Sequence, residues 1–64
     1  MIPKASLKKI LKQNGAERVS AEAVDTFQNE VEEYANIIAT TSVKFASHAN
    51  RKTIKSDDIS LACN

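Results

Sequence analysis

The sequence predicts an all-α domain that runs as short helix, loop, long helix, loop, short helix. Its apolar residues recur at alternating steps of three and four, which places them on one face of a helix. The chain holds one glycine and one proline, and neither lies between Ser20 and Asn50, so that stretch can form one continuous helix. We expect residues 1–64 to form a single domain.

The first short helix is expected from about Lys4 to Asn14. Pro3 suits the first turn of a helix, because its missing N–H would have no partner there. The apolar stripe of this helix consists of Leu7, Ile10 and Leu11. Gly15 should end the helix, since glycine readily adopts the left-handed conformation that closes one.

The long helix is expected to begin after Ser20, which suits an N-cap, and to end near Asn50. Its apolar stripe consists of Val24, Phe27, Val31, Tyr34 or Ala35, Ile38, Phe45 and Ala49. About 28 residues at a rise of 1.5 Å make a helix of roughly 42 Å. Two short flanking helices cannot cover a stripe of that length. We therefore expect a second long helix, from another copy of the chain, to cross it.

The third helix is expected to be short. Asn50 tolerates the left-handed backbone that ends the long helix, and residues 51–55 should form an extended loop. Ser56 is the expected N-cap of the third helix. The apolar residues expected to be buried from this helix are Ile59, Leu61 and Ala62.

The chain needs a further source of stability. A domain of 64 residues buries only about 60% of the surface that its unfolded chain exposes, and small domains are usually held by disulfides, a metal or a partner. Cys63 is the only cysteine and can form no bridge within the chain. His48 and Cys63 are the only soft ligands, whereas structural zinc takes four. We expect a partner chain and no metal, no cofactor and no membrane-spanning segment, in a soluble, cytoplasmic protein.

The charges are unevenly distributed, although their total is only +1. Bases dominate up to Arg18, acids occur without any Lys or Arg from Val19 to Val43, and bases dominate again from Lys44. If folding or pairing brings the two ends together, a strongly basic surface results despite the small total. The sequence contains no glycine-rich phosphate loop, no nucleophile–base pairing and no metal cluster, so we expect no enzymatic activity.

Two motifs at the loops resemble those of the histone fold, and specifically of archaeal histones. They are the segment 15–20, GAERVS, and the segment 48–55, HANRKTIK, followed by Asp58-Ile59. The resemblance extends over essentially the whole chain. It implies an intertwined head-to-tail dimer in which the first loop of one chain lies beside the second loop of the other. It further implies binding and bending of double-stranded DNA, association with the chromosome, and stacking of dimers into a nucleosome-like superhelix.

The resemblance assigns roles to individual residues. Arg18 is expected in the minor groove where that groove faces the protein. Thr53 is expected to bind a phosphate and to hold Arg18, while Lys52 contacts the DNA backbone. Lys9 on the first helix and Lys55 in the second loop complete the expected DNA surface. Because no base edge is read, sequence preference should follow how easily the DNA bends.

Several of these residues have alternative roles. Arg51 either contacts phosphate or pairs with Asp58 and so locks the second loop onto the third helix. His48 is either an exposed histidine near a helix end or, by resemblance, meets Asp58 of a neighbouring dimer. The apolar neighbours in that dimer–dimer contact would be Phe45 and Leu61. Gly15 is a helix C-cap, and by resemblance it also lets successive superhelical turns stack closely.

The sequence departs from the family pattern in ways that leave alternatives open. Asn50 replaces a usual glycine, Ser47 replaces a common base, and no Lys or Arg follows Lys55. These features favour weak, salt-sensitive DNA binding or a specialised role. The main alternative is a histone-fold module that pairs with another histone-fold chain in a larger assembly. A helical regulator that uses the apolar stripe would explain the long helix but not the two loop motifs.

Overall fold

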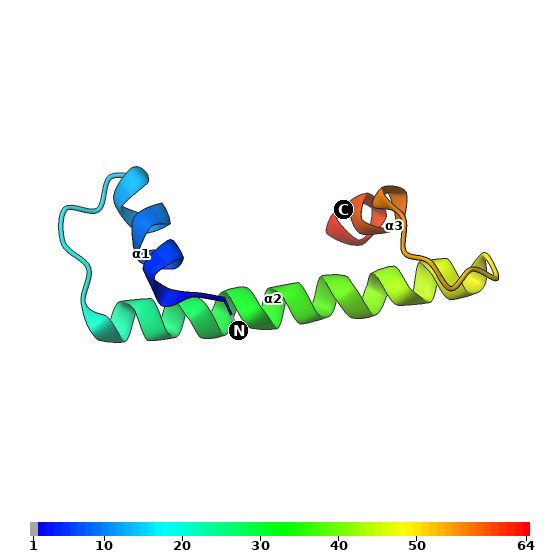
Figure 1. Cartoon of the computed structure of the whole chain (residues 1–64), viewed down its shortest axis with the longest axis horizontal. Helices are drawn as coiled ribbons and strands as arrows, with labels where there is room; N and C mark the ends of the chain where they lie inside the picture. Colours follow the sequence, from blue (N-terminus) through cyan, green and yellow to red (C-terminus); the bar gives the residue numbers. More distant parts are fainter. Residues whose placement is uncertain (1) are drawn as a thin grey trace. The chain divides into compact units, whose positions relative to one another are not determined.

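A computed structural model of the chain describes residues 2–64. Within that range the chain forms three helices, α1 (Lys4–Gln13), α2 (Ala21–His48) and α3 (Ser56–Cys63), and no strand. The order of short, long and short helix confirms the predicted all-α class (Figure 1). The chain divides into two compact units, the first reaching Glu33 and the second beginning at Tyr34, so the boundary falls within α2.

In the first unit, α1 lies against the beginning of α2 (Figure 1). Leu7 of α1 and Val24 of α2 are buried. Two side chains of α2 also hold the backbone that precedes α1. The amide of Gln28 donates to the carbonyl of Ile2 at 2.6 Å, and a carboxylate oxygen of Glu32 accepts from the N–H of Ile2 at 3.3 Å.

The first loop begins where α1 ends. The N–H of Gly15 donates to the carbonyl of Lys12, and the N–H of Ala16 donates to that of Leu11, both at 3.1 Å. This pair of bonds is a Schellman motif, which requires a left-handed residue just after the helix. Gly15 supplies it with φ of 108°. The predicted helix end is therefore confirmed, with α1 stopping one residue earlier than expected.

The start of α2 follows the predicted capping. The hydroxyl oxygen of Ser20 accepts from the N–H of Ala23 at 3.0 Å, as an N-cap does for one of the helix's unbonded donors. After this cap, α2 runs from Ala21 to His48, 28 residues without a break.

In the second unit, α3 packs against the later part of α2 (Figure 1). Ala46 is buried, and beside it Ser42 exposes only 1% of its surface. The α2 helix ends in a second Schellman motif, in which Asn50 donates to Ser47 and Arg51 donates to Ala46, both at 2.9 Å. Asn50 takes the left-handed position with φ of 58°, as its sequence position predicts.

The start of α3 differs from the prediction. Ser56 is the first residue of the helix, and the N-cap is Lys55. The carboxylate of Asp58, in the first turn, accepts from the N–H of Lys55 at 2.8 Å. The acid three residues after the cap thus makes the N3-to-N-cap bond of a capping box, which differs from the bond expected of the serine hydroxyl.

The apolar core of the chain is small. Among the described residues, the buried apolar side chains are Leu7, Val24 and Ala46. Many large apolar side chains are exposed: Ile10, Tyr34, Ile37, Val43, Phe45, Ile54, Ile59 and Leu61. The expected burial of Ile59 and Leu61 is not reached within one chain, where these residues expose 41% and 57% of their surface.

Candidate nucleic-acid interface

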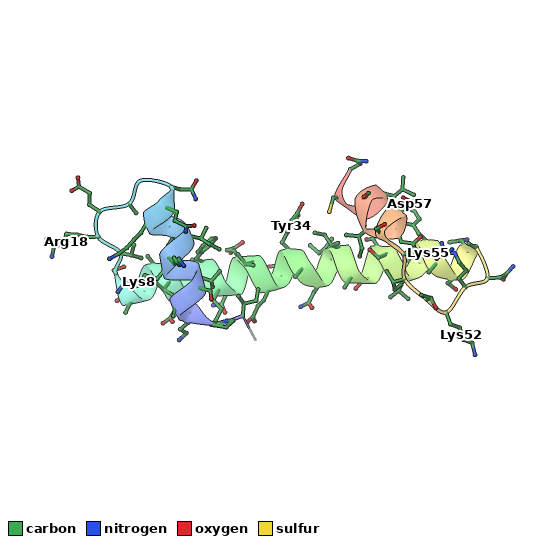
Figure 2. All side chains as sticks on the ribbon, turned by 45° about the horizontal axis from the view of Figure 1, so that its top comes forward. Lys8, Arg18, Tyr34, Lys52, Lys55 and Asp57 are labelled. Carbon is green, nitrogen blue, oxygen red and sulfur yellow. The ribbon has the colours of Figure 1, made fainter. Side chains whose placement is uncertain are left out.

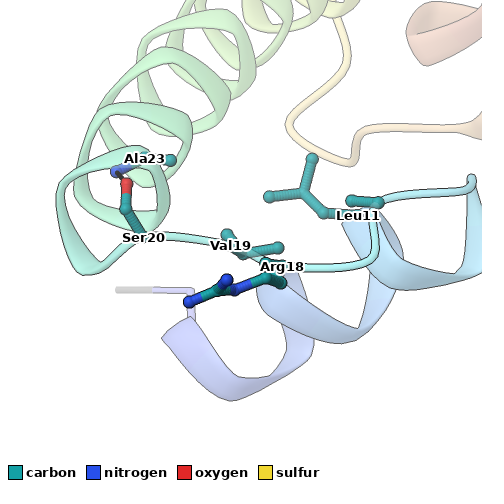
Figure 3. Close-up of a pocket in the computed structure, with 6 residues that line it drawn as sticks. Leu11, Arg18, Val19, Ser20 and Ala23 are labelled. Carbon is teal, nitrogen blue, oxygen red and sulfur yellow. Dashed lines mark hydrogen bonds between the residues drawn. The ribbon is translucent and has the colours of Figure 1, made fainter.

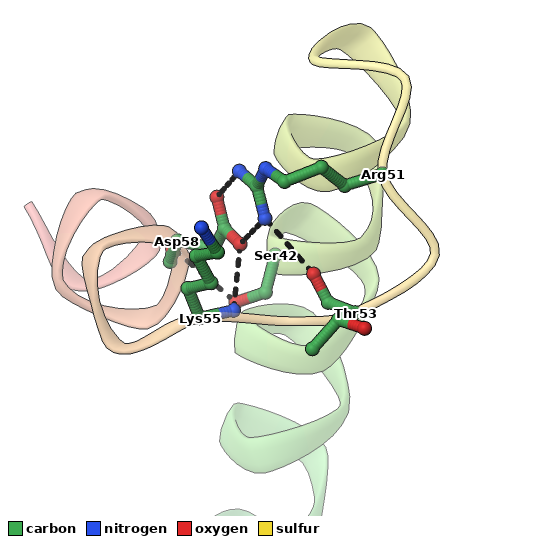
Figure 4. Close-up of polar contacts among 5 residues, drawn as sticks. All are labelled: Ser42, Arg51, Thr53, Lys55 and Asp58. Carbon is green, nitrogen blue, oxygen red and sulfur yellow. Dashed lines mark hydrogen bonds and ion pairs between the residues drawn. The ribbon is translucent and has the colours of Figure 1, made fainter.

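The second loop is organised around Asp58 (Figure 4). The guanidinium of Arg51 donates to both oxygens of this carboxylate, each at 2.9 Å. The same guanidinium donates to the carbonyl oxygen of Thr53 at 2.9 Å. Together with the N–H of Lys55, these bonds tie residues 51–55 to the first turn of α3. Bidentate pairs of this kind are stronger and more directional than single ion pairs.

This network changes the acidity of its carboxyl group. The hydrogen bond from Arg51, followed by the one from the N–H of Lys55, lowers the pKa of Asp58 from 3.8 to about 2. The hydrogen bond to Asp58 correspondingly raises the pKa of Arg51. The side chain of Asp58 exposes 4% of its surface, against 28% for Arg51. Asp58 is therefore a buried anion whose charge is matched inside the loop.

Ser42 supports the network from α2, and the sequence analysis did not single it out. Its hydroxyl donates to the carbonyl of Ile38 at 2.7 Å and lies 3.4 Å from the carbonyl of Asp58. The sequence signal was present, since Ser42 lies four residues before Ala46 on the apolar side of the helix. A hydroxyl at that position fits beside the α3 backbone.

The lysine side chains of the second loop lie outside this network. Lys52, Thr53 and Lys55 are exposed, and Figure 2 shows Lys52 pointing away from the ribbon. The second unit therefore places an Arg51–Asp58 pair inside the loop and two lysines on its surface. Such lysines are free to meet a phosphate backbone.

The first loop carries the other predicted arginine. Arg18 is exposed, and its side chain points away from the ribbon in Figure 2. It stands at the edge of a hollow of about 610 Å³ (Figure 3). The hollow is lined by Leu11, Ala16, Arg18, Val19, Ser20 and Ala23. Most of its wall is thus apolar, with Arg18 and the N-cap serine as its polar members.

The outer face of α1 is more basic than the prediction of Lys9 alone suggested. A shallow hollow of about 450 Å³ on this helix is lined by Ala5, Lys8, Lys9, Lys12 and Gln13. Lys4, in contrast, pairs with Asp25 at 2.7 Å. The spacing of Lys8 and Lys12 by four residues could have revealed the shared face from the sequence.

Three of the four residues proposed for contacts between dimers are accessible, whereas the fourth, Asp58, is buried. His48, Phe45 and Leu61 are all exposed in the second unit, with Phe45 at 36% and Leu61 at 57%. At Gly15 an added Cβ would meet no atom within 4 Å. The surface at Gly15 is therefore open, and its positive φ is the feature that requires glycine in this chain.

A metal site and a membrane-spanning helix are both absent from the part of the chain that the structure describes. Residues 2–64 bring together no group of three or more His, Cys, Asp or Glu side chains that could hold a metal ion. No helix formed by these residues combines the length and apolar character needed to cross a membrane.

The order of the helices and the two loop motifs agree with the protein family that the sequence matches. Residues 1–63 match the family described as histone-like transcription factor (CBF/NF-Y) and archaeal histone. The chain belongs to this family. Binding and bending of DNA are general in the family, whose archaeal members package DNA on the chromosome and are not enzymes.

Three similar proteins come from two archaea. The chain is 39% identical to one of the subunits of archaeal histone HAN1 from Thermococcus zilligii and 46% identical to probable archaeal histone 3 of Methanocaldococcus jannaschii. Each match covers 95% of this chain and 91% of the relative. The chain is also 44% identical to DNA-binding protein HmvA of Methanocaldococcus jannaschii, over 92% of this chain and 62% of that protein. The resemblance to archaeal histones is thus confirmed.

Proposed function

We propose that this histone-family chain pairs head to tail with a second copy through the apolar face of α2. The observation that carries the proposal is the contrast between a very small buried core and a large exposed apolar surface. Tyr34 and Ile37 each expose 58% of their surface on α2, and Leu61 exposes 57% on α3. Large contiguous apolar surface is characteristic of an interface. Burial against a second copy would supply the core that one chain lacks.

The paired protein would bind and bend double-stranded DNA. Head-to-tail pairing sets Arg18 of one copy beside Lys52, Thr53 and Lys55 of the other. Lys9 on the two first helices adds a central contact. These side chains suit phosphate and minor-groove contacts rather than base edges. The pair would accordingly choose DNA by its deformability and not by its base sequence.

Arg51 is assigned to the loop rather than to the DNA. Its guanidinium already holds Asp58 through two bonds and the carbonyl of Thr53 through a third. A phosphate contact by Arg51 would require breaking part of this network. The Arg51–Asp58 ion pair therefore orders the loop that presents Lys52 and Lys55.

A salt titration of DNA binding tests this surface. The double variant Arg18→Ala with Lys52→Ala removes two charges from each chain, or four from a dimer. The slope of log K against log salt should become shallower by about 0.9 for each phosphate that is no longer neutralised. The control is Lys4→Ala with Lys44→Ala, which removes the same charge from positions outside the proposed surface. Equal binding by the parent and the first double variant, at one salt concentration, would refute the surface.

The dimers are further proposed to chain along DNA into a superhelix. Arg51 and Lys55 donate three bonds to Asp58, and a carboxylate offers about four acceptor positions. One position remains for His48 of a neighbouring dimer, with Phe45 and Leu61 packing beside it. Gly15 would permit close stacking of turns. Nuclease digestion of saturated DNA should leave a ladder of fragments that shortens with His48→Ala, and an unchanged ladder would count against the contact.

A second candidate function is pairing with a different histone-family chain. One relative is named as one of the subunits of a histone, and the net charge of +1 is low for a protein that wraps DNA alone. Mixing the chain with another histone-family chain and weighing the complexes by native mass spectrometry distinguishes the two. A predominant mixed dimer would favour this candidate, and a predominant self-dimer would favour the first.

A further inference from the structure

Apolar packing within one chain holds α1 only loosely on its unit. Of the ten residues of α1, Leu7 is the one that is buried, with 2% of its surface exposed. Burial of apolar surface is non-directional, so a single buried side chain does not stop a helix from rolling about its own axis. Such a roll would move every exposed side chain of the helix. The orientation of α1 therefore needs a directional contact.

The two described residues that precede α1 have such contacts for all of their backbone polar groups. The N–H of Ile2 donates to a carboxylate oxygen of Glu32 at 3.3 Å, and the carbonyl of Ile2 accepts from the side-chain amide of Gln28 at 2.6 Å. Pro3 has no N–H, and its carbonyl accepts from the N–H of Leu7 at 3.3 Å. An ordered segment needs a partner for each of these groups. Residues 2–3 are thus held on α2.

The side chains that hold this segment form one row along α2. Asp25, Gln28 and Glu32 are spaced by three and four residues, which places them on one side of the helix. Asp25 binds the ammonium of Lys4 at 2.7 Å. Residue numbers rise along this row while they fall along the segment it holds, so residues 2–4 run antiparallel to α2. We call Asp25, Gln28 and Glu32 the α1 clamp.

Gln28 is the member of the α1 clamp whose position a stability argument does not explain. It exposes 6% of its surface and lies four residues after Val24, on the apolar side of α2. An apolar side chain there would avoid the cost of burying an amide. A buried polar group with its partner in place instead fixes one arrangement of the segments around it. The Lys4–Asp25 pair is exposed on both sides and adds little energy.

The face that this orientation turns outward is basic. Lys9 and Lys12 follow Leu7 by two and five residues, which at about 100° per residue places them on the opposite side of α1. Together with Lys8 they line the shallow hollow of this helix, and all three lysines are exposed. We call Lys8, Lys9 and Lys12 the lysine face. Because Leu7 and the lysine face are two sides of one helix, a contact that prevents the roll of α1 fixes both.

We propose that Gln28, supported by Asp25 and Glu32, is a positioning residue that fixes the lysine face of α1 for contact with DNA. The inference rests on the DNA binding proposed above and names what orients its central contact, the one assigned to Lys9. Gln28 contacts no phosphate itself. Its bond to the backbone of Ile2 sets the lysines in place before DNA arrives, so less conformational freedom is lost on binding.

A substitution that changes no charge tests this role. Gln28→Met keeps a side chain of similar length and removes the bond to Ile2. DNA binding should weaken about twofold to tenfold, the range for the loss of one hydrogen bond. The slope of log K against log salt should also become shallower, by about 0.9 for each phosphate that the lysine face no longer neutralises. A purely structural role would leave this slope unchanged, so an unchanged slope would overturn the inference.

A double-mutant cycle tests whether Gln28 acts through the lysine face. The loss of DNA affinity from Lys9→Ala is measured in the parent and in Gln28→Met. We expect a smaller loss in Gln28→Met, because its lysine face has already lost part of its contact. Arg18→Ala in the first loop is the control, and its loss should be the same in both proteins.

The cycle also separates this inference from the proposed function. If Lys9→Ala weakens binding equally in both proteins, the proposed DNA surface is kept and only the role of Gln28 is overturned. If Lys9→Ala has no effect in the parent, the central contact of the proposed function and this inference are both overturned.

Glu32 supplies a second test if circular dichroism shows that Gln28→Met does not fold. Glu32→Ala and Glu32→Gln remove the same charge, but only glutamine keeps an oxygen that can accept from the N–H of Ile2. Glu32→Ala should therefore bind DNA more weakly than Glu32→Gln, with a shallower salt slope. Equal affinities and slopes for these two variants would contradict the proposed positioning.

Discussion

The two loops begin alike and are completed differently. Each follows a Schellman motif, with Gly15 at φ of 108° in the first loop and Asn50 at φ of 58° in the second. After this shared turn, the second loop binds itself to α3 through Arg51 and Asp58. The first loop instead leads into a capped helix and borders an open apolar hollow.

This difference separates order within the chain from order that needs a partner. In the second loop, the charges of Arg51 and Asp58 are matched and this carboxylate is buried inside one unit, so contacts within the chain hold the loop. The first loop is bounded by Ser20 at one end and Gly15 at the other, and its apolar wall is open. In the proposed head-to-tail pair, each ordered second loop would lie beside the open first loop of the other copy.

The largest effect on this contrast is expected from Asp58→Asn. The substitution removes the buried charge that Arg51 and Lys55 hold. It should therefore reduce thermal stability more than a substitution at Gly15 or Ser20 does. Because folding lowers the pKa of Asp58 from 3.8 to about 2, its contribution is complete above about pH 4. That contribution is lost as the pH falls toward 2.

Circular dichroism melts between pH 2 and pH 7 measure this prediction, at one protein concentration because pairing makes the melting temperature depend on it. The parent should lose stability on acidification more steeply than Asp58→Asn. The same acid dependence in both proteins would mean that the second loop is not held by this carboxylate.

A smaller effect is expected at the shared turn. Gly15→Ala should destabilise the protein by about 1–2 kcal/mol through backbone strain, since the added Cβ meets no neighbouring atom. Asn50→Gly should stay within about 0.5 kcal/mol of the parent, because asparagine tolerates the left-handed region. Urea unfolding gives both values. A gain from Asn50→Gly as large as the loss from Gly15→Ala would contradict this. It would show that asparagine is as strained in the second turn as alanine is in the first.

A loss at the lower end of that range is expected from Ser20→Ala. Losing the hydroxyl that accepts from Ala23 should cost about 1 kcal/mol of stability. Ser20→Asp is the matched control, because aspartate also caps a helix and suits its positive end. Unfolding of the three proteins in urea checks the order. If Ser20→Ala were neutral, capping would contribute nothing to the first loop.

Much of the fold could be predicted from residue order. The absence of Gly and Pro between Ser20 and Asn50 indicated one long helix, and the helix observed there has 28 residues. The turns at Gly15 and Asn50 followed from their tolerance of left-handed backbone. The N-cap at Ser20 was also predicted correctly. These features are local, so residues close in the chain determine them.

One feature that sequence reasoning missed is local, and others depend on contacts across the chain. Ser56 was expected to cap α3, but Asp58 accepts from the N–H of Lys55, only three residues before it. Gln28 and Glu32 hold the backbone of Ile2, a contact between residues at least 26 positions apart. Such pairings have no periodic signal, because they depend on how two segments approach each other in space.

The sequence by itself determined the helices, the two turns and the membership of the histone family, since each depends on local spacing or on contiguous motifs. Tertiary structure decided which polar groups are used internally. It placed Arg51 on a buried carboxylate while Arg18 lies at the edge of an open hollow, although both are arginines in loops that flank α2. Burial and hydrogen-bond geometry distinguish them, and neither is encoded in residue type alone.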